Sequence, residues 1–498
     1  MLIEDTPPSA SQDQRRAGAL LHLTSLPGPG PCGDLGMPAR NYVDFLADCG
    51  ISVWQMLPVG PTQRELSPYQ TSSAHAGSWR LIALEPLVEQ GWLQAEELAA
   101  LQGSDEGKAR ALSLAYGRFQ EAGDTSDRQG LERFVAEHSY WLEDWSLFWA
   151  LRQEIGQCWW HWPDALRHRD PQDLAAARAR LSAEIDFIVF EQYLFFSQWQ
   201  TLRAYAEARG IRLFGDMPIF VAHDSAEVWA RPQDFDLNPD GTTRVVAGVP
   251  PDYFSATGQR WGNPLYRWQE MVNDGFRFWI DRIRTQLRLF HMVRIDHFRG
   301  FEAYWEIPAG ETYAIHGRWV KAPGAALFSR LNQYFGQIPL IAEDLGLITE
   351  EVEALRKRFR LPGMKVLQFA FSGGAANPYL PFHHDRDSVV YTGTHDNDTT
   401  LGWYESLSDA ERAYVGEYLG RPAEPMPWPL VRCAFASRAH LAVVPMQDIL
   451  GLDSAHRMNT PGTVDAKNWQ WRFDWSSVPS DLPARMRRLV AIYGRLVS

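Results

Sequence analysis

Short apolar runs that end on a polar or acidic residue recur along the chain. They indicate buried parallel strands whose carboxyl ends carry polar side chains. Stretches with helical spacing of apolar positions lie between several of these runs, and such alternation predicts an α/β fold rather than an α+β fold. Eight runs are enough for a (β/α)8 TIM barrel. They lie at 19–23, 52–57, 212–216, 292–296, 340–344, 366–370, 389–394 and 442–445.

The helical pattern is clearest in five stretches, several of which begin near Ser, Pro or Asp, as helices commonly do. These stretches are 39–49, 198–209, 275–290, 323–335 and 350–358.

The spacing of the runs is uneven, which predicts large insertions between strands. About 150 residues separate the second and third runs, far more than a usual barrel connection. Two amphipathic stretches within this gap, 86–101 and 131–155, predict that insertion 58–197 is a largely helical subdomain.

A second insertion, 218–274, is expected to form a loop-rich lid over the active site. Its segment 247–266 is rich in Gly, Pro and aromatic residues, and this composition favours an ordered loop at the barrel mouth. Residues 1–16 are polar and contain Pro7 and Pro8, so we expect a flexible N-terminal tail. The remaining chain, 17–498, is predicted to be a single catalytic barrel.

The net charge of the chain limits the classes of binding partner that can be expected. The formal net charge is −13 and no dense Lys or Arg run is present, which argues against nucleic acid and anionic membranes as partners. A neutral substrate suits such a chain better.

The cysteines and the apolar stretches indicate which cofactors and which cellular compartment can be expected. The four cysteines are scattered and form no CxxC or Cys/His cluster, so neither a metal site nor a redox pair is predicted. The N-terminus lacks the apolar core of a signal peptide, and no stretch approaches the roughly 20 apolar residues of a membrane span. We therefore expect a cytoplasmic protein.

Tryptophan is unusually frequent, with 21 residues in 498. Aromatic rings stack on the apolar face of sugars, although each single Trp is more readily explained as core filling. The surplus therefore only suggests a carbohydrate ligand.

Three predicted strand ends place carboxylates where barrel enzymes carry their chemistry. They provide Asp296, Glu343 and Asp396. A retaining glycosidase needs a nucleophile and a proton donor about 5 Å apart, and Asp296 and Glu343 are the candidates for these two functions. Arg294 lies two residues before Asp296, on the same face of a strand, where its charge would keep the nucleophile ionised. His395 precedes Asp396 and is able to hydrogen-bond a sugar hydroxyl.

These segments resemble the signature blocks of amylomaltases, the 4-alpha-glucanotransferases or disproportionating enzymes of the α-amylase clan. The three main blocks read VRIDHFRG from 293, AEDLG from 342 and THDNDT from 394. Further similar stretches read LHLTSLPG from 21, SPYQ from 67, GDMPIFV from 215, GVPPDYFS from 248, WGNPLY from 261 and MNTPGT from 458. The resemblance extends from about residue 19 to residue 475.

The resemblance implies a (β/α)8 barrel without a separate C-terminal β-domain, and retaining transfer without a cofactor or metal. It implies that α-1,4-glucans and maltooligosaccharides are donors, that glucose or glucans are acceptors at the 4-hydroxyl, and that cyclic glucans are a further product of the same chemistry. A monomer is expected. The implied site comprises Asp296 as nucleophile, Glu343 as acid/base, Asp396 as transition-state stabiliser, Asp216, Arg294 and His395 as sugar-binding residues, and Tyr69 and Trp261 as stacking platforms.

Three alternatives are weighed against transfer. An α-1,4-glucan hydrolase would share the first half-reaction and differ only in using water as the acceptor. The aromatic segment 247–266 favours a stacked sugar over water. A non-catalytic glucan-binding protein would be expected to lack at least one carboxylate, and all three are present. An enzyme of phosphorylated sugars would require a Gly-rich, basic segment near the last strands, and the eighth run instead ends on Gln447 and Asp448.

Overall fold

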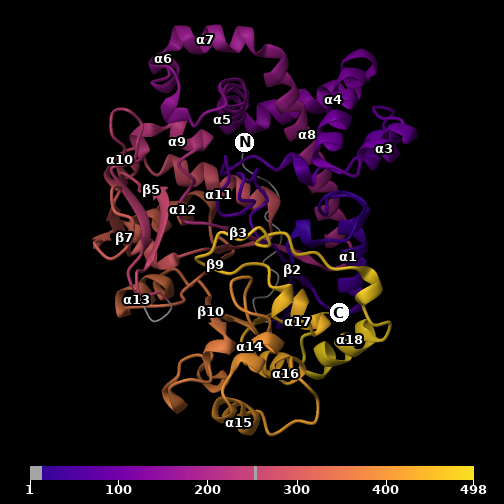
Figure 1. Cartoon of the computed structure of the whole chain (residues 1–498), viewed down its shortest axis with the longest axis vertical. Helices are drawn as coiled ribbons and strands as arrows, with labels where there is room; N and C mark the ends of the chain where they lie inside the picture. Colours follow the sequence, from indigo (N-terminus) through magenta and orange to yellow (C-terminus); the bar gives the residue numbers. More distant parts are fainter. Residues whose placement is uncertain (1–13, 252–254, 498) are drawn as a thin grey trace.

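Eight parallel strands form the centre of the molecule. The computed structural model describes residues 14–251 and 255–497. The strands are hydrogen-bonded in the order β10-β11-β12-β1-β2-β3-β6-β9, and Ala342 at the end of β9 donates its N–H to Pro362 O, just before β10, at 2.8 Å. This bond joins the two ends of the sheet, so the predicted (β/α)8 barrel is confirmed (Figure 1). The strands are β1 Arg16–Leu20, β2 Val53–Gln55, β3 Arg212–Met217, β6 Met292–Ile295, β9 Leu340–Ala342, β10 Gly363–Val366, β11 Ser388–Tyr391 and β12 Leu441–Pro445.

All eight predicted runs contain or touch a barrel strand, but two predicted boundaries were wrong. The run 366–370 shares only Val366 with β10, because the following residues form a 3-10 turn, Leu367–Phe369. Both parts are buried, and burial alone does not distinguish a strand end from a turn. At the other position, β1 begins at Arg16, three residues before the predicted run.

The predicted tail overlaps this first strand. Residues 1–13 of the predicted tail 1–16 lie outside the described residues. Arg15 donates to the backbone oxygens of Phe435 and Ser437, and the N–H of Arg16 donates to His440 O at 2.8 Å. The end of the predicted tail is therefore part of the barrel wall, because it pairs with β12, a strand more than 400 residues away in sequence that local composition cannot reveal.

Helices surround the barrel, and each of the five predicted helical stretches lies within or across a helix. These helices and the remaining ones around the barrel are α1 Met37–Asp48, α8 Ser182–Glu207, α11 Arg277–Leu289, α12 Gly324–Phe335, α13 Glu350–Arg358, α14 Thr400–Ser406, α15 Asp409–Tyr418, α16 Trp428–Ala436, α17 Met446–Leu450 and α18 Leu482–Ile492.

Helices also fill most of the chain between β2 and β3, and they gather at one end of the molecule (Figure 1). The longest, α5, begins with a capping box at Asp124 and ends at Gly156, whose φ of 72° terminates it. The predicted helical stretch 86–101 is divided into two helices by a turn at Gly91, with φ of 75°. The helices in this part are α2 Glu85–Glu89, α3 Ala95–Leu101, α4 Asp105–Ala122, α5 Thr125–Ile155, α6 Asp164–Arg167 and α7 Pro171–Arg180.

A second, antiparallel sheet lies beside the barrel and differs from the ordered loop predicted for 247–266. In this segment β5 pairs with β4, and β4 also pairs with β7, one of two strands that follow β6, so the strand order is β5-β4-β7-β8. The partner strands lie about 40 or more residues downstream, so the pairing cannot be inferred from the local pattern. The strands are β4 Val245–Val249, β5 Gln259–Pro264, β7 Ala303–Pro308 and β8 Arg318–Lys321, and the short helices α9 Ala226–Ala230 and α10 Trp268–Asn273 flank β4 and β5 in sequence.

The tryptophan surplus mainly serves the core. Several of the largest fully buried side chains are tryptophans, and aromatic rings bury much apolar area for one residue. These residues are Trp54, Trp159, Trp162, Trp199, Trp229 and Trp279.

A buried guanidinium fastens the C-terminus to the barrel. Arg495, which follows α18, has no exposed surface, although burial lowers its pKa to about 9. Its nitrogens donate to the backbone oxygens of residues that precede or begin β1 and β12. The acceptors are Arg16, Ala434, Phe435, Ser437, Ala439 and His440. Arg495 therefore satisfies carbonyl groups that would otherwise be buried without a partner.

We predict that Arg495→Met lowers the free energy of unfolding by about 2–4 kcal/mol, because several buried carbonyls lose their donor. Urea denaturation followed by circular dichroism measures this change. The matched control is Arg488→Met on the exposed side of α18, which should alter stability by less than about 0.5 kcal/mol. Equal effects of the two substitutions would contradict the structural function assigned to Arg495.

Candidate active site

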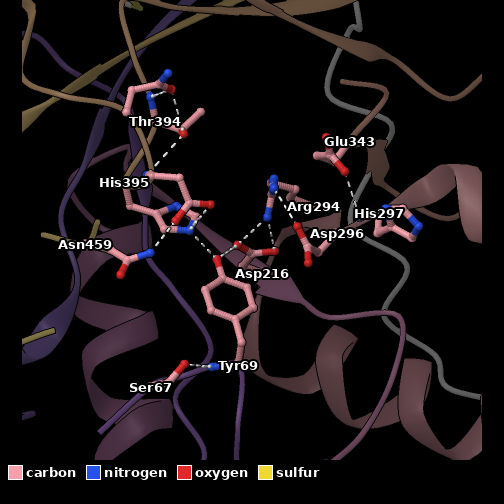
Figure 2. A network of polar contacts seen from close by, with 12 residues as sticks. Ser67, Tyr69, Asp216, Arg294, Asp296, His297, Glu343, Thr394, His395 and Asn459 are labelled. Atoms are coloured by element: carbon pink, nitrogen blue, oxygen red, sulfur yellow. Dashed lines mark hydrogen bonds and ion pairs between the residues drawn. The ribbon is translucent and has the colours of Figure 1, made fainter. Parts of the chain in front are cut away.

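The carboxyl ends of β3, β6, β9 and β11 bring most of the predicted site residues to the mouth of the barrel (Figure 2). Asp216 lies in β3 and is in register with Arg294 of β6, so both side chains leave the barrel wall at the same level. Asp296 directly follows β6 and Glu343 directly follows β9. Parallel strands thus place side chains from distant parts of the sequence at a single end of the barrel.

Arg294 connects two of these carboxylates. Its Nη1 donates to both oxygens of Asp216, at 2.9 and 2.7 Å, and its Nη2 donates to Asp296 Oδ1 at 2.7 Å. The Arg294 side chain is 5% exposed and that of Asp216 is fully buried, whereas that of Asp296 is 29% exposed. Burial opposes the charge on Arg294, but the two carboxylates raise its pKa well above the ordinary value. Asp296 is therefore held by a permanent cation while it still faces the opening.

Tyr69 joins Asp216 to the segment after β11. Its hydroxyl donates to Asp216 Oδ2 at 2.6 Å and lies 2.9 Å from His395 Nε2. The two rings are stacked, with centroids 5.3 Å apart. Burial and the neighbouring Asp216 raise the pKa of Tyr69 well above its ordinary value, so the phenol keeps its proton and remains a donor.

Glu343 has a different environment from Asp296. Its carboxyl group accepts backbone N–H bonds from His297, at 2.7 Å, and from Leu345, at 3.0 Å. These bonds and Arg294 favour the ionised form, but burial outweighs them and raises the pKa of Glu343 to about 8. The group is therefore protonated at neutral pH, unlike an ordinary glutamate.

Asp396 accepts hydrogen bonds from side chains on two segments. Asn459 Nδ2 donates to its Oδ1 at 2.6 Å, and His395 Nε2 lies 3.3 Å from its Oδ2. Partial burial would raise the pKa of Asp396, but His395 and the bond from Asn459 lower it well below the ordinary range. Asp396 is consequently an anion whose side chain is still 47% exposed.

Trp261 reaches the site from the second sheet. It lies on β5, and its ring meets the His297 ring edge-on at a centroid distance of 4.8 Å. His297 adopts φ of 53°, an uncommon conformation for a residue with a side chain, and burial lowers the pKa of its imidazole to about 4. A neutral His297 therefore joins the Trp261 ring to the backbone that hydrogen-bonds Glu343.

The structure thus brings all the predicted site residues together through two sets of contacts. One connected network of polar contacts joins Tyr69, Asp216, Arg294, Asp296, His395 and Asp396. Glu343 and Trp261 approach this network through His297, the residue next to Asp296.

Three residues of the site were not predicted. Asn459 and His297 lie inside segments that carry the family resemblance, so the signal was present, but their contacts depend on the fold. Trp469 packs against Tyr69 and His395, at 5.8 and 6.0 Å between centroids, with φ of 67°. No local sequence feature marks that conformation.

The described residues contain no group of three His, Cys, Asp or Glu side chains placed to hold a metal ion. Within the same part of the chain, no helix is both long and apolar enough to cross a membrane.

Comparisons with known proteins agree over nearly the whole chain. Residues 21–477 match the 4-alpha-glucanotransferase family of glycoside hydrolases. The 4-alpha-glucanotransferase of Thermus thermophilus is 51% identical over 497 residues, which cover 97% of this chain and 99% of that protein. That of Synechocystis sp. is 45% identical over 500 residues, with 97% and 99% covered.

Solved structures of amylomaltases are also similar to this chain. The amylomaltase from Streptococcus agalactiae in complex with acarbose superimposes with a TM-score of 0.94 at 35% identity, covering 97% of this chain and 100% of that chain. The amylomaltase from Corynebacterium glutamicum, at 19% identity and a TM-score of 0.74, shares the fold. Given a family match over most of its length, relatives near half identity and the same architecture, this chain belongs to the 4-alpha-glucanotransferase family.

Proposed function

We propose that this protein cleaves α-1,4-glucans by a retaining double displacement and transfers the glycosyl segment to the 4-hydroxyl of another glucan or of glucose. The observation that carries the proposal is the contrast between two carboxyl groups at the barrel mouth. Asp296 is ion-paired with Arg294, whereas burial raises the pKa of Glu343 and favours its protonated form. One group is thus prepared to attack and the other to donate a proton, as a retaining glycosidase requires.

In the first half-reaction, a carboxylate oxygen of Asp296 forms a bond to the anomeric carbon of the donor sugar as the glycosidic C–O bond breaks. The electron pair of that bond goes to the leaving oxygen, which takes the proton of Glu343. The products are a glycosyl ester on Asp296, a free 4-hydroxyl on the departing chain and an ionised Glu343. The backbone N–H groups of His297 and Leu345 stabilise that anion.

In the second half-reaction, Glu343 takes the proton of an incoming 4-hydroxyl, whose oxygen attacks the anomeric carbon. The ester bond to Asp296 then breaks, and its electrons return to the carboxylate beside Arg294. Two inversions at one carbon give retention of the α configuration. No cofactor is required at any step.

The remaining site residues are proposed to bind the reacting sugar. Asp396 is ionised and half-exposed, so it is suited to accept hydrogen bonds from ring hydroxyls that strengthen at the oxocarbenium-like transition state. Asp216, Arg294 and His395 surround the same position. The rings of Tyr69 and Trp261 are proposed to pack against sugar rings at the cleavage point.

Hydrolysis differs from transfer only in the acceptor, so the choice depends on water exclusion. The second sheet places Trp261 against His297, next to the nucleophile, where a stacked sugar acceptor would be favoured over water. The named activity of the closely similar relatives also supports transfer.

With maltotriose as sole substrate, we predict glucose and a ladder of longer maltooligosaccharides, while the number of reducing ends stays constant. Chromatography of the products by chain length, together with a reducing-sugar assay, measures both quantities. Rising reducing ends with only shorter products would establish a hydrolase instead, and unchanged maltotriose would favour a binding protein.

Substitution of the two carboxylates should separate their functions. Glu343→Gln is expected to lower turnover of maltotriose by at least about 100-fold, because it removes general acid catalysis. It should still release a burst of about one fluoride per enzyme from α-maltotriosyl fluoride, because this leaving group needs no proton and only the second half-reaction then lacks its base. Asp296→Asn should lose both reactions, because it lacks the nucleophile. Glu417→Gln, at an exposed position on α15, is the control. Loss of fluoride release in Glu343→Gln, with the fold intact by circular dichroism, would argue against this division.

The pH dependence follows from Glu343. Its pKa is raised to about 8, so its proton is present below that pH and is lost as the pH rises through it. We predict that kcat/KM for maltotriose falls on the alkaline side with a midpoint near pH 8, since kcat/KM reports the free enzyme. The rate of the fluoride burst from α-maltotriosyl fluoride in Glu343→Gln should lack this limb. A limb that persists in this variant would assign the titration to another group.

A further inference from the structure

Exposed apolar side chains lie on two segments that Arg299 joins, the β7–β8 hairpin and the chain that follows the proposed acid/base residue. We call these side chains the outer rim and define it as Tyr313, Ile315, Trp319 and Leu347, which are 57%, 46%, 39% and 63% exposed. The first three belong to the β7–β8 hairpin, and Leu347 lies four residues after Glu343. Figure 1 shows β7 and the small sheet beside the barrel, on the side where α13 follows β9. Clustered exposed apolar groups of this kind commonly mark binding surfaces.

Arg299 joins the outer rim to the proposed catalytic segments. It lies three residues after Asp296, its guanidinium carbon sits 3.8 Å from the centroid of the Trp319 ring, and its Nη1 donates to Leu347 O. The side chain of Trp305 meets Trp319 edge-on at 5.2 Å. Trp319 is therefore held from two sides and remains 39% exposed.

The hairpin that carries the outer rim is fixed by hydrogen bonds. Trp305 Nε1 donates to Ala314 O at 2.9 Å, and the N–H of Ala314 donates to Thr257 O at 3.1 Å. Ala314 is fully buried between Tyr313 and Ile315, so its neighbours are exposed on a folded segment. A surface held in this way loses little conformational entropy on binding, which favours affinity.

The position of the outer rim indicates which part of a substrate it would meet. In the proposed mechanism Glu343 protonates the leaving oxygen and later deprotonates the acceptor hydroxyl, so the acceptor chain lies on the Glu343 side of the cleavage point. Leu347, four residues after Glu343, and Trp319 are both exposed, and Arg299 contacts both. An uncharged chain of sugar rings offers apolar faces that suit an indole and an aliphatic side chain, with no charge to desolvate.

We propose that the outer rim binds sugar units of a long acceptor glucan, beyond the units held at the cleavage point. This inference rests on the proposed function and adds to it a preference for acceptor length. Glucose and other short acceptors do not reach the outer rim, and long linear maltooligosaccharides do.

The test compares two acceptors with one donor. With α-maltotriosyl fluoride as donor, the KM is measured for glucose and for a linear maltodecaose. Trp319→Ala is expected to raise the KM for maltodecaose about three- to tenfold, the loss of one aromatic stacking contact, while the KM for glucose changes less than about twofold. Tyr313→Ser should act in the same direction with a smaller effect.

The control is Tyr414→Ala on α15, where the tyrosine is 37% exposed, close to the value for Trp319, at the end of the molecule away from the small sheet (Figure 1). It should leave both KM values unchanged. Equal KM increases for both acceptors in Trp319→Ala would mean that Trp319 acts through Arg299 on the acid/base segment, and would overturn the proposal. Unchanged KM for maltodecaose in both rim variants would overturn it as well. Absence of any transfer to glucose by the unsubstituted protein would instead refute the proposed function.

Discussion

The site depends on the ion pairs of Arg294, a guanidinium buried between two carboxylates. An isolated buried charge is costly, and its cost is offset only when partners satisfy it with good geometry. Asp216 binds Arg294 through both oxygens, Asp296 through one, and Tyr69 occupies a remaining lone pair of Asp216. Asp296 thereby keeps one oxygen free of Arg294. The same arrangement that stabilises the buried cation therefore orients the proposed nucleophile.

The loop that carries Tyr69 is held by two helices, α8 before β3 and α9 after it. The side-chain amide of Gln192 on α8 holds Gly77 by both its N–H and its carbonyl, at 2.8 and 3.0 Å. Ser73 Oγ donates to the buried Glu227 at 2.7 Å and accepts the N–H of His75. These helices therefore hold the chain that directly follows Tyr69.

The second sheet contacts the segments around Glu343. It carries Trp261 to His297, whose backbone holds Glu343, and through Trp319 it supports Arg299, whose guanidinium reaches Leu347 beyond Glu343. Burial raises the pKa of Glu343 despite two backbone donors. The two carboxyl groups thus differ because one is ion-paired with a cation near the opening, whereas the other accepts backbone N–H bonds and has its pKa raised by burial.

The sequence by itself determined the barrel, because eight apolar runs ending on polar residues are sufficient evidence for eight parallel strands. Asp296, Glu343 and Asp396 lie at or just after the ends of three of these runs. The sequence did not determine that β4 joins a separate sheet through β7, or that Arg16 belongs to the barrel wall, because both pairings are with strands far along the chain. Side-chain contacts such as Asn459 with Asp396 were also decided only by the tertiary structure. Local pattern records which residues are buried, whereas pairing, protonation and orientation arise when distant segments meet.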